Sequence, residues 1–351
     1  MRKFTAVLLS ILLLLPLLSG CGAKSKSPVD AYFDLVAEME GVTEQNFTIT
    51  MEMKSDAMAG FASSLTLIME GAASAKNKQL EATLTMTTRS PRRSVELTDI
   101  IIDGNELYIN AASLFQAAGE MEEGLTAEVE LFMNMILGGS DYIMFDLSDF
   151  KIWDINLNEH PVLLRLNDVY IKEIKKAQSP LISADNGVYS LEMDGEFMLD
   201  LLNVFVDDVD ENLDEYVDAV YELLQFISAL MEGYMDYLEM FGPLDAGLSE
   251  LDISKSELRD KLRDGLEDFR DALDDMYSDK YWAEQKYFSS IEKSNDTYTY
   301  INETSAEDST VRLEYVAEKA AVLEIKPPRR YIEINEVIDN LLSMMGLDYM
   351  F

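Results

Sequence analysis

The side chains that usually carry out catalysis are scarce in this chain of 351 residues. Cys21 is the only cysteine, and His160, directly before Pro161, is the only histidine. A lone histidine at a helix entry is typical of a surface or capping residue, and it cannot build a multi-histidine metal site. The sequence contains no glycine-rich phosphate loop, G-x-S-x-G elbow or H-E-x-x-H helix. We therefore expect a protein that is not an enzyme and that needs no cofactor.

Carboxylates are abundant, with 66 Asp and Glu residues against 28 Lys and Arg residues. Two carboxylates about 5 to 10 Å apart can hydrolyse a glycosidic bond, so a hydrolase of wall polymers stays open as the lowest alternative. Asp207, Asp208 and Asp210 are weak candidates for a cation site. They do not begin an EF-hand, because Leu213 and Ala219 stand where a loop starting at Asp208 needs Gly and Glu. The simpler interpretation of this acidic run is a solvated loop between helices.

The amino terminus has the order of an export signal. Two basic residues precede an apolar run, residues 6–18, that is too short for a bilayer core, which needs about 20 residues. The tetrapeptide that follows, Leu18-Ser19-Gly20-Cys21, resembles the lipobox of bacterial lipoprotein signals. This resemblance implies cleavage between Gly20 and Cys21 and a diacylglyceryl group on the Cys21 thiol.

We therefore expect residues 1–20 to be a signal peptide and residues 21–27 to be a lipidated tether. The tether would hold the protein on the extracytoplasmic face of the cell membrane, because two or more acyl chains anchor stably. With Cys21 acylated, no thiol remains for a disulfide, a nucleophile or a metal site. The domain that we expect over residues 28–351 must then depend on its hydrophobic core.

The acidic balance excludes one class of partner. The formal net charge is −38, and loss of the two basic residues of the signal would take it to −40. The 78 residues between Lys176 and Lys255 contain 19 Asp and Glu and no Lys or Arg. Nucleic-acid binding needs clustered Lys and Arg, so we expect no nucleic-acid partner. The acidic stretch could present a negative face to a cationic partner or cations, or could simply keep the protein soluble.

Hydrophobic spacing predicts an α+β domain with a large antiparallel sheet. Apolar and polar residues alternate with the period of strands at 47–53, 64–74, 79–88, 94–102, 106–109, 142–147, 188–193, 298–300, 311–315, 322–325 and 329–334. Spacings of three and four predict helices at 111–118, 161–176, 196–206, 213–241 and 254–276. Ser254 and Glu257 form a capping box at the last of these helices. The long acidic helices within residues 195–280 would form an inserted hairpin that covers the sheet.

Residues 100–115 read Ile-Ile-Ile-Asp-Gly-Asn-Glu-Leu-Tyr-Ile-Asn-Ala-Ala-Ser-Leu-Phe and follow a series of alternating Thr- and Met-rich segments. Over residues 45–115 and 297–345, this pattern resembles Gram-positive surface lipoproteins with a LolA/LppX-like fold. The resemblance implies a curved antiparallel sheet, here of about 8–11 strands, that is packed against helices. It also implies that the sheet and the helices enclose a lipid or another apolar molecule.

Flexible methionine and aromatic side chains would suit the lining of such a cavity. The candidates occupy the strands and the long helix: Met51, Met53, Met69, Met86, Phe226, Met231, Tyr234 and Tyr237. An ordinary hydrophobic core would explain the same methionine and aromatic residues. The leading interpretation is a non-enzymatic envelope protein that binds an apolar ligand. The alternative is a structural or interaction lipoprotein with a filled core, whose acidic helices bind a partner or cations.

Replacement of Cys21 by alanine tests the predicted anchor. Without the thiol no diacylglyceryl group can be attached, so the variant is expected to lose both lipid labelling and membrane association. Incorporation of a labelled fatty acid and fractionation of the host cells measure the two effects. A Cys21→Ala protein that stays in the membrane fraction would contradict the prediction of a lipid anchor.

Overall fold

The computed structural model of the chain describes residues 27–55, 64–89, 92–121, 131, 134–148, 161–177, 182–222, 224–225, 253–306, 309–320 and 323–345. Several predicted positions lie outside these described residues: Gly20, Cys21, His160, Phe226, Met231, Tyr234 and Tyr237. By compactness the chain divides into two units, each drawn from separated stretches of sequence. Unit 1 comprises Met1–Gly41, Ile155–Ile291 and Thr304–Glu307, and unit 2 comprises Val42–Asp154, Glu292–Glu303 and Asp308–Phe351. The single domain expected over residues 28–351 stays a prediction.

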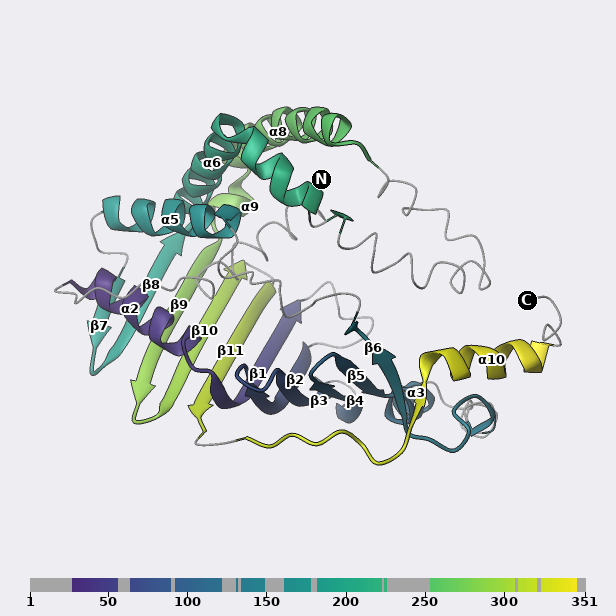
Figure 1. Cartoon of the computed structure of the whole chain (residues 1–351). Helices are drawn as coiled ribbons and strands as arrows, with labels where there is room; N and C mark the ends of the chain where they lie inside the picture. Colours follow the sequence, from purple (N-terminus) through teal and green to yellow (C-terminus); the bar gives the residue numbers. More distant parts are fainter. Residues whose placement is uncertain are drawn as a thin grey trace. The chain divides into compact units, whose positions relative to one another are not determined.

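Unit 2 is built on a large sheet of neighbouring strands (Figure 1). These strands are β1 (Glu44–Ser55), β2 (Ser64–Ser74), β3 (Gln79–Arg89), β4 (Arg92–Asp103), β5 (Glu106–Asn110), β6 (Tyr142–Asp146), β10 (Thr297–Ala306), β11 (Ser309–Lys319) and β12 (Tyr331–Glu333). Their order is β12-β6-β5-β4-β3-β2-β1-β11-β10. The pairs from β11 through β1 to β6 are antiparallel, as predicted. The short edge strand β12 differs, because it pairs with β6 in parallel.

Two apolar clusters lie at the end of this sheet that is formed by β4, β5, β6 and β12. α3 (Ala111–Met121) packs against β4, and α10 (Ile334–Met345) packs against β6 and β12. The first cluster joins both helices to the sheet and consists of Ala111, Ile136, Leu137, Ile332 and Val337. The second consists of Ile101, Tyr108, Met144 and Ile325. The prediction of a strand at 322–325 is wrong for residues 323–325, which form no strand. The Ile325 side chain is nevertheless buried in the second cluster.

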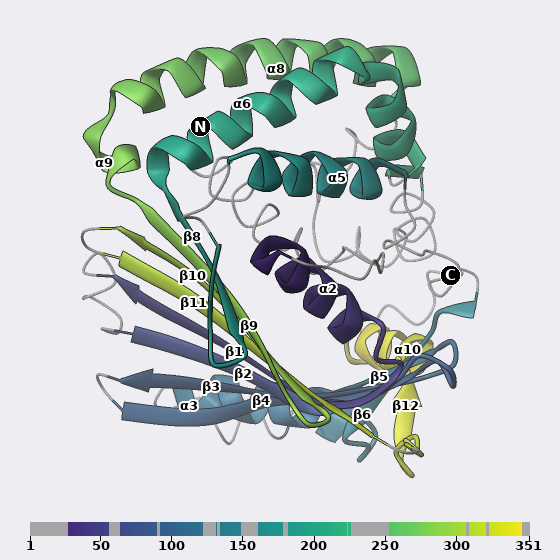
Figure 2. The same ribbon diagram turned by 90° about the vertical axis from the view of Figure 1, so that its left-hand side faces the viewer.

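Unit 1 contains most of the helices. They are α2 (Pro28–Glu40), α5 (Pro161–Lys176), α6 (Gly195–Glu211), α8 (Lys255–Ser278) and α9 (Lys280–Ala283). Its strands follow the order β9-β8-β7 and are β7 (Ile182–Asp185), β8 (Val188–Asp194) and most of β9 (Lys286–Ser294). The last three residues of β9 belong to unit 2, and the last three of β10 belong to unit 1. Helix α6 packs against α5 on one side and against α8 on another (Figure 2). The described residues thus contain twelve strands, against the expected 8–11, because β7 and β9 were not predicted.

The predicted acidic hairpin is described only in part. Residues 213–222 are helical, and Leu213 and Val217 pack against Leu258 of α8. The capping box of Ser254 and Glu257 at the start of α8 is confirmed, with both of its hydrogen bonds present. Most of the predicted helix at 213–241 lies outside the described residues, so the hairpin as a whole stays a prediction.

Two glycine substitutions compare a position in the sheet that has no space for a Cβ with a helix position that has open space. A Cβ on Gly71 in β2 would meet the carbonyl oxygen of Glu81 and lie 2.8 Å from Ala82 Cα, whereas a Cβ on Gly265 in α8 would meet nothing within 4 Å. We expect Gly71→Ala to lower the free energy of unfolding by about 2 kcal/mol or more, because the β2–β3 backbone must move. The matched Gly265→Ala change should raise it by about 0.5 to 1 kcal/mol.

Urea denaturation followed by circular dichroism measures both changes. A Gly71→Ala protein as stable as the parent would contradict the close approach of β2 and β3.

Candidate functional site

Apolar side chains of four neighbouring strands lie on one face of the unit 2 sheet. Residues that pair directly across antiparallel strands point to the same face. Met51 of β1 pairs with Leu67 of β2, and Leu67 pairs in turn with Met86 of β3. On its other edge, Met51 pairs with Leu313 of β11. The predicted strand methionines therefore share a face.

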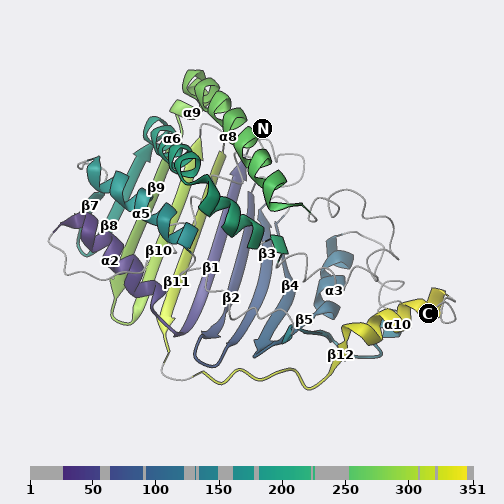
Figure 3. The same cartoon turned by 45° about the horizontal axis from the view of Figure 1, so that its top comes forward.

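We call this surface the Met face. It comprises Ile49, Met51, Met53, Leu65, Leu67, Met69, Leu84, Met86, Val311, Leu313 and Tyr315. Ten of these side chains are half-buried, and Val311 is exposed to 37%. The four strands that carry them lie next to one another (Figure 3). Sequence reasoning named the methionines as candidates but not Leu67, Leu313 and Tyr315, although all three lie in segments that were predicted as strands.

The opposite face of the same strands is mainly polar, although it includes Ile68 and Val316. Thr48, Thr50 and Glu52 alternate with the apolar residues of β1. On β11, Arg312 forms ion pairs with Glu303 at 3.4 Å and with Glu314 at 3.1 Å. This contrast between faces is expected of a sheet that places one side against apolar groups.

The half-buried part of the Met face ends at β4. Val95 and Thr98 continue the face because they pair with Met86 and Leu84, but both side chains are buried. α3 packs against this strand, and the Thr98 hydroxyl donates to the Asn110 carbonyl oxygen at 3.1 Å. Leu97 is an extra residue in β4 where the register with β3 shifts. The bulge keeps Thr98 and Val95 on one side of the strand although they are three residues apart.

The chemistry available on the Met face is that of an apolar contact surface. Its only polar side-chain atom is the Tyr315 hydroxyl, and burial raises the pKa of that phenol. The phenol therefore stays neutral at physiological pH. Methionine side chains have three rotatable bonds and a polarisable sulfur, so they adapt to ligands of irregular shape. The Met face can bind apolar groups, but it offers no acid, base or nucleophile.

The three acidic cation candidates lie in α6 rather than in the expected loop, and they contact arginines. Asp208 accepts hydrogen bonds from Arg165 Nε at 2.8 Å and from the Tyr216 hydroxyl at 2.8 Å. Arg270 Nη2 donates to Asp207 Oδ1 at 3.1 Å and to Asp210 Oδ2 at 2.9 Å. Burial and the Asp208 carboxylate raise the pKa of Tyr216, so its hydroxyl stays protonated as a donor.

Within the described ranges no group of three or more His, Cys, Asp or Glu residues is arranged to hold a metal ion. In the same part of the chain, no helix combines the length and the apolar character needed to cross a membrane. No protein-family model matches the chain, and comparisons with curated proteins and with solved structures find no match either.

Asp208 and Asp214 provide a matched test of the helix contacts. The Asp208 side chain is 16% exposed, whereas Asp214, which pairs with Arg259 at 3.1 Å, is 72% exposed. We expect Asp208→Ala to lower the free energy of unfolding by about 1.5 to 3 kcal/mol, because it removes charge-assisted hydrogen bonds from a partly buried site. Asp214→Ala should cost no more than about 1 kcal/mol. Chemical denaturation of both variants measures the loss of unfolding free energy in each. Equal losses would contradict the prediction that Asp208 contributes more to stability than the exposed Asp214.

Proposed function

We propose that the protein is a lipid-anchored, non-enzymatic protein of the bacterial cell envelope, which binds an apolar, lipid-like ligand on the Met face. In this proposal the Cys21 lipid holds the domain on the extracytoplasmic side of the membrane. The order of basic residues, apolar run and Leu18-Ser19-Gly20-Cys21 supports the anchor.

The observation that supports ligand binding is the half-burial of the Met face. Four adjacent strands spaced about 4.8 Å apart carry its side chains over a width of roughly 14 Å. An apolar surface of this extent gains free energy when it is removed from water, by about 25 cal/mol for each Å² that becomes buried. A ligand held in this way is selected by shape, because the face provides hardly any hydrogen-bonding groups.

The acidic helices supply less support for the alternative, a structural lipoprotein that binds a cationic partner. Part of their charge is already compensated inside unit 1, since Lys255 pairs with Asp218 and Arg259 with Asp214. Acids that are engaged in this way are less available to a partner. The Met face contains no Asp or Glu, so it supplies no carboxylate pair for a wall-polymer hydrolase.

Met51 and its neighbour Thr50 provide the test, because they adjoin on β1 but point to opposite faces. Met51→Gln keeps the side-chain length and adds a polar amide, so the bound ligand loses an apolar contact. We expect about fivefold weaker lipid binding, which corresponds to about 1 kcal/mol of lost burial. Thr50→Gln adds the same amide to the polar face and should leave binding unchanged.

Native mass spectrometry of the soluble body, residues 22–351, purified from its own host, measures the lipid directly. The parent protein and Thr50→Gln should carry a co-purifying lipid mass, which should be reduced in Met51→Gln. A parent protein that stays free of ligand after incubation with envelope lipids would contradict the proposed function. Equal binding by both variants would place the ligand away from the Met face.

A further inference from the structure

Unit 1 contains a hollow of about 440 Å³ between α5 and α6. This volume falls within the range of about 300 to 1,000 Å³ that is usual for small-molecule sites. The residues that line it come from α5 and the position after it, and from α6: Glu173, Lys176, Ala177, Phe197, Asp200, Leu201, Asn203 and Val204. Sequence reasoning did not identify this site, because it depends on which faces of two helices meet.

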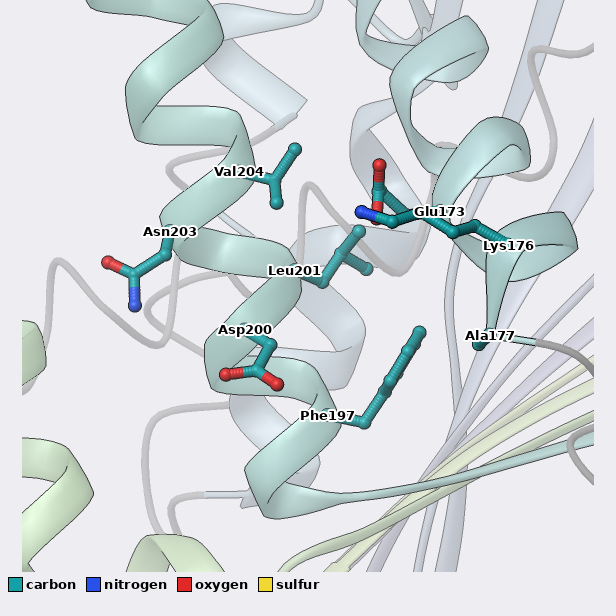
Figure 4. Close-up of a pocket in the computed structure, with 8 residues that line it drawn as sticks. All are labelled: Glu173, Lys176, Ala177, Phe197, Asp200, Leu201, Asn203 and Val204. Atoms are coloured by element: carbon teal, nitrogen blue, oxygen red, sulfur yellow. The ribbon is translucent and has the colours of Figure 1, made fainter.

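The hollow has an apolar wall on α6. Phe197 and Leu201 extend from α6 toward α5, and Glu173 and Lys176 extend from α5 toward α6 (Figure 4). Leu201 is 3% exposed, whereas Phe197 and Val204 are half-buried. The half-buried Phe197 ring and Val204 side chain can therefore still contact an incoming apolar group.

The charged groups of the hollow differ in how firmly they are held. Lys176 Nζ lies 3.0 Å from Glu173 Oε2, but the Lys176 side chain is 71% exposed and the Glu173 side chain only 15%. The carboxylate is thus fixed in the wall, while its ammonium partner reaches in from solvent. An exposed ion pair of this kind contributes little, so Lys176 can be displaced at small cost.

A second carboxylate stands at the edge of the hollow. Asp200 Oδ1 accepts a hydrogen bond from the Tyr277 hydroxyl at 2.7 Å, and Asn203 Nδ2 donates to the same hydroxyl at 2.8 Å. Burial and the bond to Asp200 raise the pKa of Tyr277 to about 12, so the phenol remains a donor at neutral pH. Tyr277 and Asn203 together hold Asp200 in one orientation.

We propose that this hollow binds an organic ammonium ion that carries an apolar substituent. The apolar substituent lies against Phe197, Leu201 and Val204, and the ammonium group takes the place of Lys176 Nζ beside Glu173. Asp200 adds a second negative charge at the edge. The proposal concerns unit 1 alone and does not depend on the function proposed for the Met face.

The sign of the ligand charge follows from the lining. Two carboxylates and one ammonium group are among the lining residues, and the ammonium group is already paired with Glu173. The whole chain carries a formal charge of −38, which attracts cations and repels anions over about a Debye length.

Three probes with the same six-carbon chain test the proposal: hexyltrimethylammonium, hexanol and hexanoate. Each is titrated into the mature chain from residue 21, carrying Cys21→Ser and labelled with ¹³C at its Leu, Val and Met methyl groups. We expect the cation to shift the methyl signals of Leu201 and Val204, and to bind about tenfold more tightly than hexanol. Hexanoate should bind more weakly than hexanol.

Variants that each neutralise one carboxylate test which acids bind the ammonium group. Glu173→Gln and Asp200→Asn should each weaken binding of the cation about threefold or more. Asp168→Asn is the matched control, because Asp168 is an exposed acid of α5 that does not line the hollow, and it should bind as the parent does. The methyl spectra of the variants without ligand report whether the fold is retained.

Three outcomes would overturn the proposal. They are equal affinity for hexyltrimethylammonium and hexanol, tighter binding of hexanoate than of the cation, and failure of the Leu201 and Val204 signals to move. If the cation instead shifts the Met51 and Met69 methyl signals, the hollow is not its site, while the proposed function of the Met face gains support. The experiment can therefore contradict the ammonium site in the hollow without contradicting the proposed function of the Met face.

Discussion

The pairing of β1 along both of its edges is the interaction on which unit 2 depends. One edge meets β2, which follows closely in sequence, and the other meets β11, so that Met51 pairs with Leu313 some 260 residues away. Closing so long a loop costs conformational entropy, which only the finished ladder and the apolar contacts of its face can offset. The Met face exists because both pairings form, since its side chains come from strands near both ends of the chain.

Local alternation was sufficient to predict β1 and β3, because each of them has one mainly apolar and one mainly polar face. It failed at β9, where Ser289, Ser290 and Ile291 are buried in succession, since a strand covered on both sides has no alternation to detect. It also could not predict the parallel pairing of β12 with β6, or the adjacency of β1 and β11. Those pairings depend on the partner strand and not on the pattern within either strand.

The end of α6 also depends on contacts that its own sequence does not reveal, and these contacts are electrostatic. Asp207, Asp208 and Asp210 lie in its last turns, where negative charge is unfavourable for the helix dipole. Considered alone, the segment therefore favours a helix that ends at Val206. In the fold, Arg165 from α5 and Arg270 from α8 contact these carboxylates and offset the cost. Within the 78-residue stretch that has no Lys or Arg, these described acids thus pair with cations from neighbouring helices, which the stretch alone cannot reveal.

Unit 2 combines two kinds of apolar packing that have different consequences. The clusters around Ala111 and Tyr108 are closed, with side chains at most 8% exposed, so their contacts hold the fold together. The Met face is half-exposed, so a polar substitution there removes less burial from the folded protein than one in either cluster. Residues of the Met face such as Met51 can therefore change while the closed clusters maintain the sheet. If the Met face binds the proposed ligand, this separation allows the contacts with that ligand to change without loss of the sheet.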